Sequence, residues 1–203
     1  SVCLGQSYKW VKNHGGSGYE VANDVQVASD GSIYVVGAYG SETTFGATTF
    51  PAPVFNDVFI VKYSTTGSVT WAKSGTCTDD SSINGLSIAP NGYVYIVGFF
   101  VATLTFDSTS VTSAGDGDVF VAKFSSAGAL QWIITAGGLY HDVAYGIVVA
   151  STGDIYITGT YTERATFGVY TIATEPGEAN IFIAKLDSSG NFLWAEDAGG
   201  PNG

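Results

Sequence analysis

The four tryptophans of this 203-residue chain recur at a nearly constant interval. They stand 61, 61 and 62 residues apart: Trp10, Trp71, Trp132 and Trp194. One tyrosine and one lysine per copy keep the same interval: Tyr34, Tyr95 and Tyr156, then Lys62, Lys123 and Lys185. Self-similarity at a fixed period of this length predicts a repeat protein, in which each copy buries its apolar face against its neighbours.

This period divides the chain into four parts. We expect an N-terminal segment over 1–13, a first repeat over 14–74, a second over 75–135, and a third repeat with the C-terminal tail over 136–203. The third copy contains one extra residue near 175–179, which we place in a loop.

Within one repeat, apolar and polar residues alternate with a period of two, which predicts half-buried strands. In the second copy we expect four strands in an antiparallel meander: 85–89, 93–100, 118–124 and 129–134. The Thr-rich stretch around 104–106 is predicted as a loop, or as a loop with one short strand. Because 27 residues are glycine, turns should be frequent, and long helices are not expected.

Two stretches of the third copy, 153–159 (GDIYITG) and 180–194 (NIFIAKLDSSGNFLW), resemble the bacterial β-propeller repeat called SBBP. The resemblance covers nearly the whole chain and implies propeller-type blades, although propellers have many unrelated functions. The fold class expected is therefore all-β, with three tandem four-stranded blade-like repeats. Closed propellers use about 4 to 8 blades, so three cannot close alone.

One strand is left over in this count. The residues Tyr8, Lys9, Trp10, Val11 and Lys12 match the fourth strand of a repeat, yet each full copy already has its own fourth strand. Either the chain is a piece of a longer propeller, or another molecule completes its ends. We therefore predict Tyr8 to Lys12 as an assembly strand that pairs with, or packs on, the terminal blade of a neighbouring copy.

Charge and hydropathy exclude two classes of partner. Seven basic residues against 18 acidic ones give a net charge of −11, which does not suit nucleic acid or an anionic membrane surface. No apolar run approaches the roughly 18 residues that a membrane helix needs, so no membrane insertion is expected. The chain begins with Ser1 and has no charged and apolar leader, and we interpret it as a processed or excised chain.

The two cysteines, Cys3 and Cys77, are too few for a disulfide scaffold or a structural zinc site. Cys77 stands at a repeat position where glycine is found in the other copies: Gly16, Gly138 and Gly200. We predict a bridge between the two cysteines, with a buried pair of free thiols as the alternative. We expect the chain to be located outside the cell or at the cell surface.

No catalytic or metal-binding set stands out. His14 and His141 occupy different repeat positions, and no Gly-x-Ser-x-Gly elbow is present. The acidic turns 79–80 and 116–118 lack the spaced carboxylates of a calcium loop, so solvated turn carboxylates are expected there. We predict no cofactor, no metal and no enzymatic activity.

The aromatic residues fall into two groups. The four tryptophans and the tyrosines 34, 95 and 156 should be structural anchors between copies, rather than a sugar-stacking platform. Six other aromatics near turns are candidates for an exposed contact surface: Tyr39, Phe99, Phe100, Tyr140, Tyr161 and Tyr170. The repeated lysines should lay their aliphatic stems on their own sheet.

The function predicted is that of a non-enzymatic structural or interaction protein. It would self-assemble into a ring or filament, or form part of a larger propeller, so its partners would be copies of itself or further repeats of a longer chain. The alternative is a module that binds a carbohydrate or another ligand. A weaker alternative is a hydrolase or lyase that acts on polysaccharides.

Overall fold

The computed structural model describes residues 10–198, and this part of the chain is all-β, with no helix. Each repeat forms a four-stranded antiparallel sheet, which we call a blade. Blade 1 consists of β1 (Glu20–Val27), β2 (Ile33–Tyr39), β5 (Asp57–Tyr63) and β6 (Val69–Cys77). Blade 2 consists of β7 (Ser81–Ile88), β8 (Val94–Phe100), β11 (Asp118–Phe124) and β12 (Leu130–Gly138). Blade 3 consists of β13 (Val143–Val149), β14 (Ile155–Thr162), β17 (Ala179–Leu186) and β18 (Phe192–Asp197).

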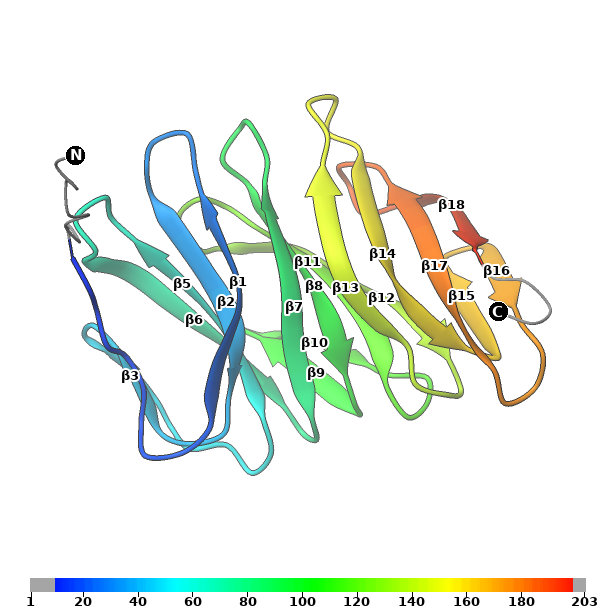
Figure 1. Cartoon of the computed structure of the whole chain (residues 1–203), viewed down its shortest axis with the longest axis horizontal. Helices are drawn as coiled ribbons and strands as arrows, with labels where there is room; N and C mark the ends of the chain where they lie inside the picture. Colours follow the sequence, from blue (N-terminus) through cyan, green and yellow to red (C-terminus); the bar gives the residue numbers. More distant parts are fainter. Residues whose placement is uncertain (1–9, 199–203) are drawn as a thin grey trace, which may run out of the picture.

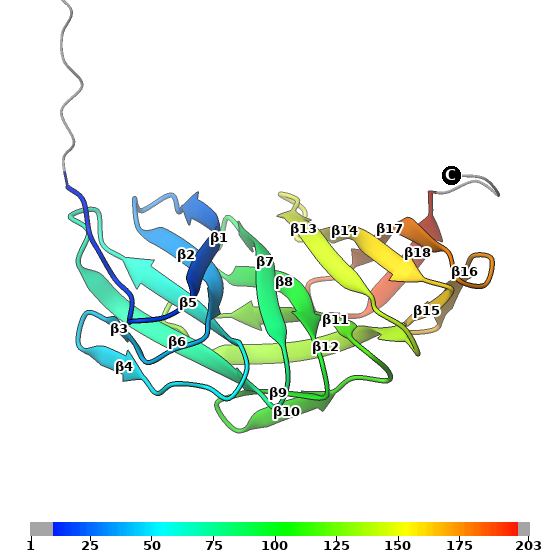
Figure 2. The same ribbon diagram turned by 60° about the horizontal axis from the view of Figure 1, so that its bottom comes forward.

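The three blades follow one another in a row, with blades 1 and 3 at opposite ends (Figure 1). Figure 2 shows the same row from a second direction: the row is open, and none of its sheets closes on itself. The expected fold class is therefore confirmed: all-β, with open, blade-like repeats. Strands β6 and β12 continue past residues 74 and 135, where the sequence analysis divides the repeats.

The stretch between the second and third strand of each blade is a hairpin, so the prediction of a loop with at most one strand is wrong. The three hairpins are β3 (Thr43–Phe45) with β4 (Thr48–Phe50), β9 (Thr103–Phe106) with β10 (Thr109–Thr112), and β15 (Arg164–Phe167) with β16 (Tyr170–Ala173). Hydroxyl pairs across each hairpin support it, as between Thr44 and Thr49 Oγ1 at 3.0 Å. A positive φ at the first turn residue closes it: Gly46, Asp107 and Gly168.

The second and third hairpins pair with the outer strand of the blade before them. Strand β9 pairs with β6, and β15 pairs with β12, so two of the blades are joined into six-stranded sheets by the hairpin of the next repeat. At the start of the chain, a single bridge joins Gly15 to Thr44 of β3, at the position that Gly137 and Thr166 take in the β12–β15 pair. Segment 10–15 thus lies where an outer strand would lie.

The core is divided between the junctions of the row. One cluster between blades 1 and 2 includes Val36, Ile60 and Ile96, and another between blades 2 and 3 includes Val97 and Ile157. A third cluster lies under the first hairpin. The repeated tyrosines 34 and 95 are 1% exposed within the first two clusters, whereas Tyr156 of blade 3 is half-buried.

Candidate interaction surfaces

Trp71 and Trp132 each pack on a glycine turn of the following blade. Trp71 lies over Gly128 and donates its Nε1 hydrogen to Ser126 O at 3.1 Å, and Trp132 lies over Gly190. These glycines have positive φ, and a Cβ at Gly128 would lie 3.1 Å from the Trp71 ring. The positive φ therefore favours glycine at these turns, and the close approach of the indole leaves little room for a Cβ. The indoles of Trp71 and Trp132 remain partly accessible at the rim.

The inner strands of neighbouring blades are joined by side-chain amides. Asn23 Nδ2 donates to Ile83 O at 2.8 Å, and Asn84 Nδ2 donates to Ala144 O at 2.9 Å, one repeat further along. The next residue in this register is Tyr145, which is 56% exposed. The two junctions are thus built with the same backbone register, and the third blade carries a different side chain at the open end.

The repeated lysines show the same difference between the interior and the end of the row. Lys62 Nζ donates to Ser126 O at 3.2 Å and Lys123 Nζ donates to Ser188 O at 3.0 Å, in both cases on the next blade. Lys185 pairs instead with Asp154 of its own blade, at 2.9 Å. All three ammonium groups lie over the repeated tyrosine of their own blade.

At the C-terminal end, the face of blade 3 that points away from blade 2 is uncovered in the part of the chain described. We call this the forward face; it comprises Tyr145, Val148, Tyr156, Thr158, Ile181 and Ile183. Ile183 is 41% exposed, while its equivalents Ile60 and Val121 are 0% exposed. A shallow groove of about 250 Å³ runs over this face and is lined by Gly146, Val148, Tyr156, Thr158 and Ile183, among others. All but Thr158 of these residues are apolar or aromatic, so this end of the row exposes mainly apolar side chains.

At the other end, blade 1 has a rear face that points away from blade 2. It comprises Ala22, Val25, Val27, Ile33 and Val35. Val25 is 59% exposed, whereas its equivalent Leu86 in blade 2 is 1% exposed. The two ends of the row therefore expose the two opposite faces of a blade, and each face is buried where blades meet inside the row.

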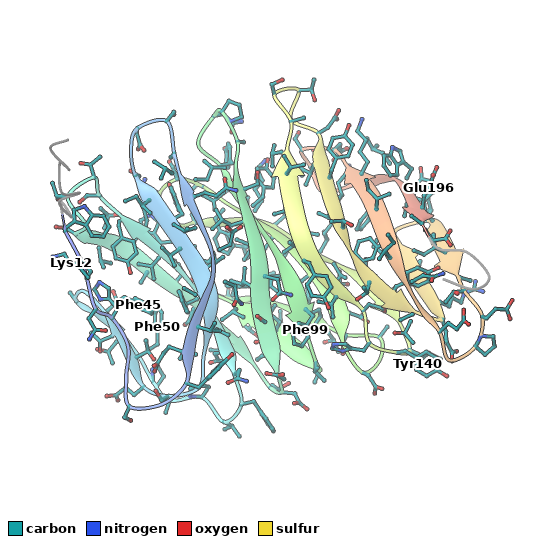
Figure 3. The ribbon with its side chains drawn as sticks, viewed as in Figure 1. Lys12, Phe45, Phe50, Phe99, Tyr140 and Glu196 are labelled. Atoms are coloured by element: carbon teal, nitrogen blue, oxygen red, sulfur yellow. The ribbon has the colours of Figure 1, made fainter. Side chains whose placement is uncertain are left out.

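The predicted contact aromatics lie in several environments. Tyr39, Phe100 and Tyr161 are 0% exposed, so their assignment to a contact surface is wrong. These three residues occupy the same repeat position, at the end of the second strand of each blade, and they pack under the hairpins of their blades. Phe99 and Tyr170 are half-buried. Tyr140 is 41% exposed, beyond the end of β12 (Figure 3).

The predicted assembly strand is only partly within the described residues, since Tyr8 and Lys9 lie outside them. In the single chain, Trp10, Val11 and Lys12 form no strand, and their role as an assembly strand with a neighbouring copy stays a prediction. Trp10 packs on Gly67 of its own chain and donates Nε1 to Thr65 O at 3.3 Å. Within residues 10–198, no strand pairs with Trp10, Val11 or Lys12. Trp10 thus occupies in blade 1 the socket that Trp71 and Trp132 fill in blades 2 and 3.

Cys77 is half-buried at the end of β6, and its Sγ lies 3.1 Å from Val101 O. Burial raises the pKa of this thiol. Cys3 lies outside the described residues, so the bridge between Cys3 and Cys77 stays a prediction.

Two buried carboxyl groups meet between blades 2 and 3. Asp142 is 0% exposed; its Oδ1 accepts from Thr162 N at 3.0 Å and its Oδ2 from Gly138 N at 2.7 Å. Asp118 Oδ1 is buried without a partner in the described structure, and a Cβ on Gly137 would collide with both carboxyl groups. Burial first, and then the charge of Asp118, raise the pKa of Asp142 to about 7. This acid joins β12 to β14, and sequence reasoning missed it because blade 2 has Ser81 at the equivalent position.

A second cavity, of about 450 Å³, lies beside this pair. Tyr140, Glu163, Arg164 and the backbone of Gly137 and Gly138 are among its lining residues. Among residues 10–198, no three His, Cys, Asp or Glu side chains cluster as a metal site would require. The described part of the chain also contains no helix long and apolar enough to cross a membrane.

Comparison with known proteins shows distant relatives. No family model matches the chain. It is 31% identical, over 143 residues and 64% of its length, to the regulatory protein FlaEY of Caulobacter vibrioides. It is 23% identical, over 171 residues and 68% of its length, to an uncharacterized WD repeat-containing protein, L264, of Acanthamoeba polyphaga mimivirus. The matches span only 14% and 12% of those proteins. The chain is therefore a repeat β-sheet module distantly related to FlaEY and to a WD-repeat protein.

Proposed function

We propose that this chain is a non-enzymatic structural or interaction module of the SBBP type, located outside the cell or at its surface. Its role is to join β-blades into a larger assembly. The blades that complete it are copies of the chain, in a ring or filament, or further repeats of a longer propeller.

The observation that carries this proposal is the contrast between equivalent positions of the row. Ile181 and Ile183 are 52% and 41% exposed, while the four residues at their positions in blades 1 and 2 are 0% exposed: Val58, Ile60, Val119 and Val121. Soluble proteins rarely leave such a patch open without a partner. The distant relation to a WD-repeat protein supports the proposal, because WD repeats form four-stranded propeller blades.

A tandem fusion tests this proposal. Joining Asp197 directly to His14 of a second copy keeps the repeat register and places a blade on the forward face without any need for association between chains. We expect the fused chain to unfold at a higher temperature than the single chain, because the added junction buries apolar surface. A fused chain whose two halves unfold independently, at the temperature of the single chain, would overturn the proposed function.

A second candidate is the binding of a carbohydrate or another small ligand in the cavity beside Tyr140. The exposed tyrosine ring and the charged Glu163 and Arg164 provide stacking and polar contacts of the kind that sugars use. Screening on a glycan array, with Tyr140→Ala as the control, tests this candidate. A polysaccharide hydrolase or lyase is the weakest candidate, and turnover assays on polysaccharides test it.

A further inference from the structure

The forward face of blade 3 and the rear face of blade 1 correspond to the two faces that meet at each of the two internal junctions between blades. We propose that the forward face of blade 3 docks on the rear face of blade 1 of a second copy, in the register of the internal junctions. This inference rests on the proposed function and specifies its partner and its contact. Because the contact joins two different faces, it repeats from copy to copy.

The residue types at the two ends match those of the internal junctions. Between blades 1 and 2, Val36, Val58 and Ile60 share a buried cluster with Leu86, Val94 and Ile96. In the proposed contact, their equivalents are Thr158, Ile181 and Ile183 on one copy, and Val25, Ile33 and Val35 on the other. Five of these six residues are aliphatic, so the apolar surfaces correspond in kind and in position.

The backbone of the forward face also leaves space for a neighbouring strand. At the junction of blades 2 and 3, Tyr145 O lies so close to Gly85 that a Cβ there would be 2.9 Å from it. Gly146 is the equivalent of Gly85 in blade 3, and a Cβ on it would meet only Thr158 Cγ2, at 3.2 Å. The space above Gly146 is therefore open to the inner strand β1 of the second copy, at Asn23.

The N-terminal segment opposes this docking. In the internal junctions, the socket of each blade receives the tryptophan of the blade before it, and the incoming copy would supply Trp194. In blade 1 that socket already holds Trp10, which is 37% exposed and bonded to Thr65 O at 3.3 Å. Trp194 must displace Trp10, so Trp10→Ala should strengthen the association of copies. If Trp10 belonged instead to an assembly strand, Trp10→Ala would weaken the association of copies.

The experiment uses the full chain with Trp10→Ala, and measures the dissociation constant between copies by sedimentation velocity. Salt must be high enough to screen the net charge of −11 on each copy. Ile183→Lys places a charge in the proposed interface, and Leu193→Lys is the matched control. Leu193 is 40% exposed against 41% for Ile183, but its equivalents Thr70 and Gln131 are exposed in the other blades.

We expect Ile183→Lys to weaken association by about tenfold or more, because a buried charge without a partner is costly. Val25→Glu on the rear face should weaken it as strongly, and Leu193→Lys should leave it unchanged. Mixing the Ile183→Lys and Val25→Glu chains should restore association, because each supplies the intact face that the other lacks. Circular dichroism and thermal melting verify that each variant is folded.

Three results would overturn the inference. In the first, the Trp10→Ala chain stays monomeric at every concentration. In the second, Leu193→Lys weakens association as much as Ile183→Lys does. In the third, the mixture of the two blocked chains does not associate. If the tandem fusion is stabilised in any of these cases, the proposed function stands and only docking in trans is excluded; if the fusion is not stabilised, both fail.

Discussion

Blades 2 and 3 have the same strand order and nearly the same apolar pattern, but they differ in how many of their faces are covered. Blade 2 packs against a blade on each side, so Val119 and Val121 are 0% exposed. Blade 3 packs on one side only, and Ile181 and Ile183 are 52% and 41% exposed at the same positions. The burial of a side chain in this row therefore depends on its neighbouring blade and not on its own sheet, as expected for a repeat array stabilised by nearest-neighbour contacts.

The largest expected effect comes from one residue type at two equivalent positions. Ile60→Ala should lower the free energy of unfolding by about 2–5 kcal/mol, because it leaves a cavity between blades 1 and 2. Ile183→Ala should lower it by less than about 1 kcal/mol, because Ile183 is already 41% exposed. Urea denaturation of both variants measures the difference. Equal losses would contradict the comparison.

A second difference separates the two internal junctions, because Asp142 stands where the other junction has Ser81. The pKa of Asp142 is raised to about 7, so the folded state holds a proton that the unfolded state, with a pKa near 4, releases. Stability should therefore fall as pH rises from about 4 to about 7, by up to about 1.4 kcal/mol per pH unit, and this contribution should then level off.

Asp142→Asn should remove this part of the pH dependence, since the amide does not titrate over this range. Its amide oxygen can still accept one of the two backbone hydrogen bonds of Asp142. Thermal melts of both proteins across this pH window provide the measurement. Parallel pH profiles for the variant and the parent would show that Asp142 titrates normally.

The tryptophans give a smaller contrast. Trp132→Ala empties the socket at Gly190 and should cost about 2 kcal/mol, below the range for a fully buried tryptophan because the indole is partly accessible. Trp194→Ala should cost under about 1 kcal/mol, because no turn in the described chain covers Trp194 from the next blade. Comparing the midpoints of urea denaturation tests this, and a larger loss for Trp194 would mean that the indole packs elsewhere.

The smallest effect belongs to the lysines. Lys185→Met should change stability by less than about 1 kcal/mol, and the change should shrink in high salt because the pair with Asp154 is partly exposed. Lys123→Met removes a bond to the carbonyl of Ser188, which should depend less on salt. Melting temperatures at low and high salt distinguish the two, and identical salt responses would contradict the different contacts.

The repeat interval predicts the architecture well, because the residues that pack between blades recur at the same position in every copy. The same interval relates Tyr39, Phe100 and Tyr161, and this recurrence indicates a structural position instead of a contact surface. The hairpins were missed because each strand has only three or four residues, too few to show alternation, and two of the hairpins pair with the preceding blade.

The candidate surfaces could not be predicted in the same way. Ile60 and Ile183 are the same residue at the same repeat position, so the residue type does not reveal which of them is exposed. That property depends on whether a neighbour is present. The expectation of a solvated turn carboxylate is wrong for Asp118, which is 2% exposed. Its pairing with Asp142 was missed because the two side chains meet only where two repeats join.

The most direct test of this account repeats the Ile183→Ala substitution inside the tandem fusion, in the first copy, where a following blade covers the forward face. The account predicts that its cost rises from less than about 1 kcal/mol in the single chain to about 2–5 kcal/mol in the fused chain, the value expected for Ile60→Ala. A cost that stays below about 1 kcal/mol in the fused chain would contradict the claim that the forward face is built to receive another blade.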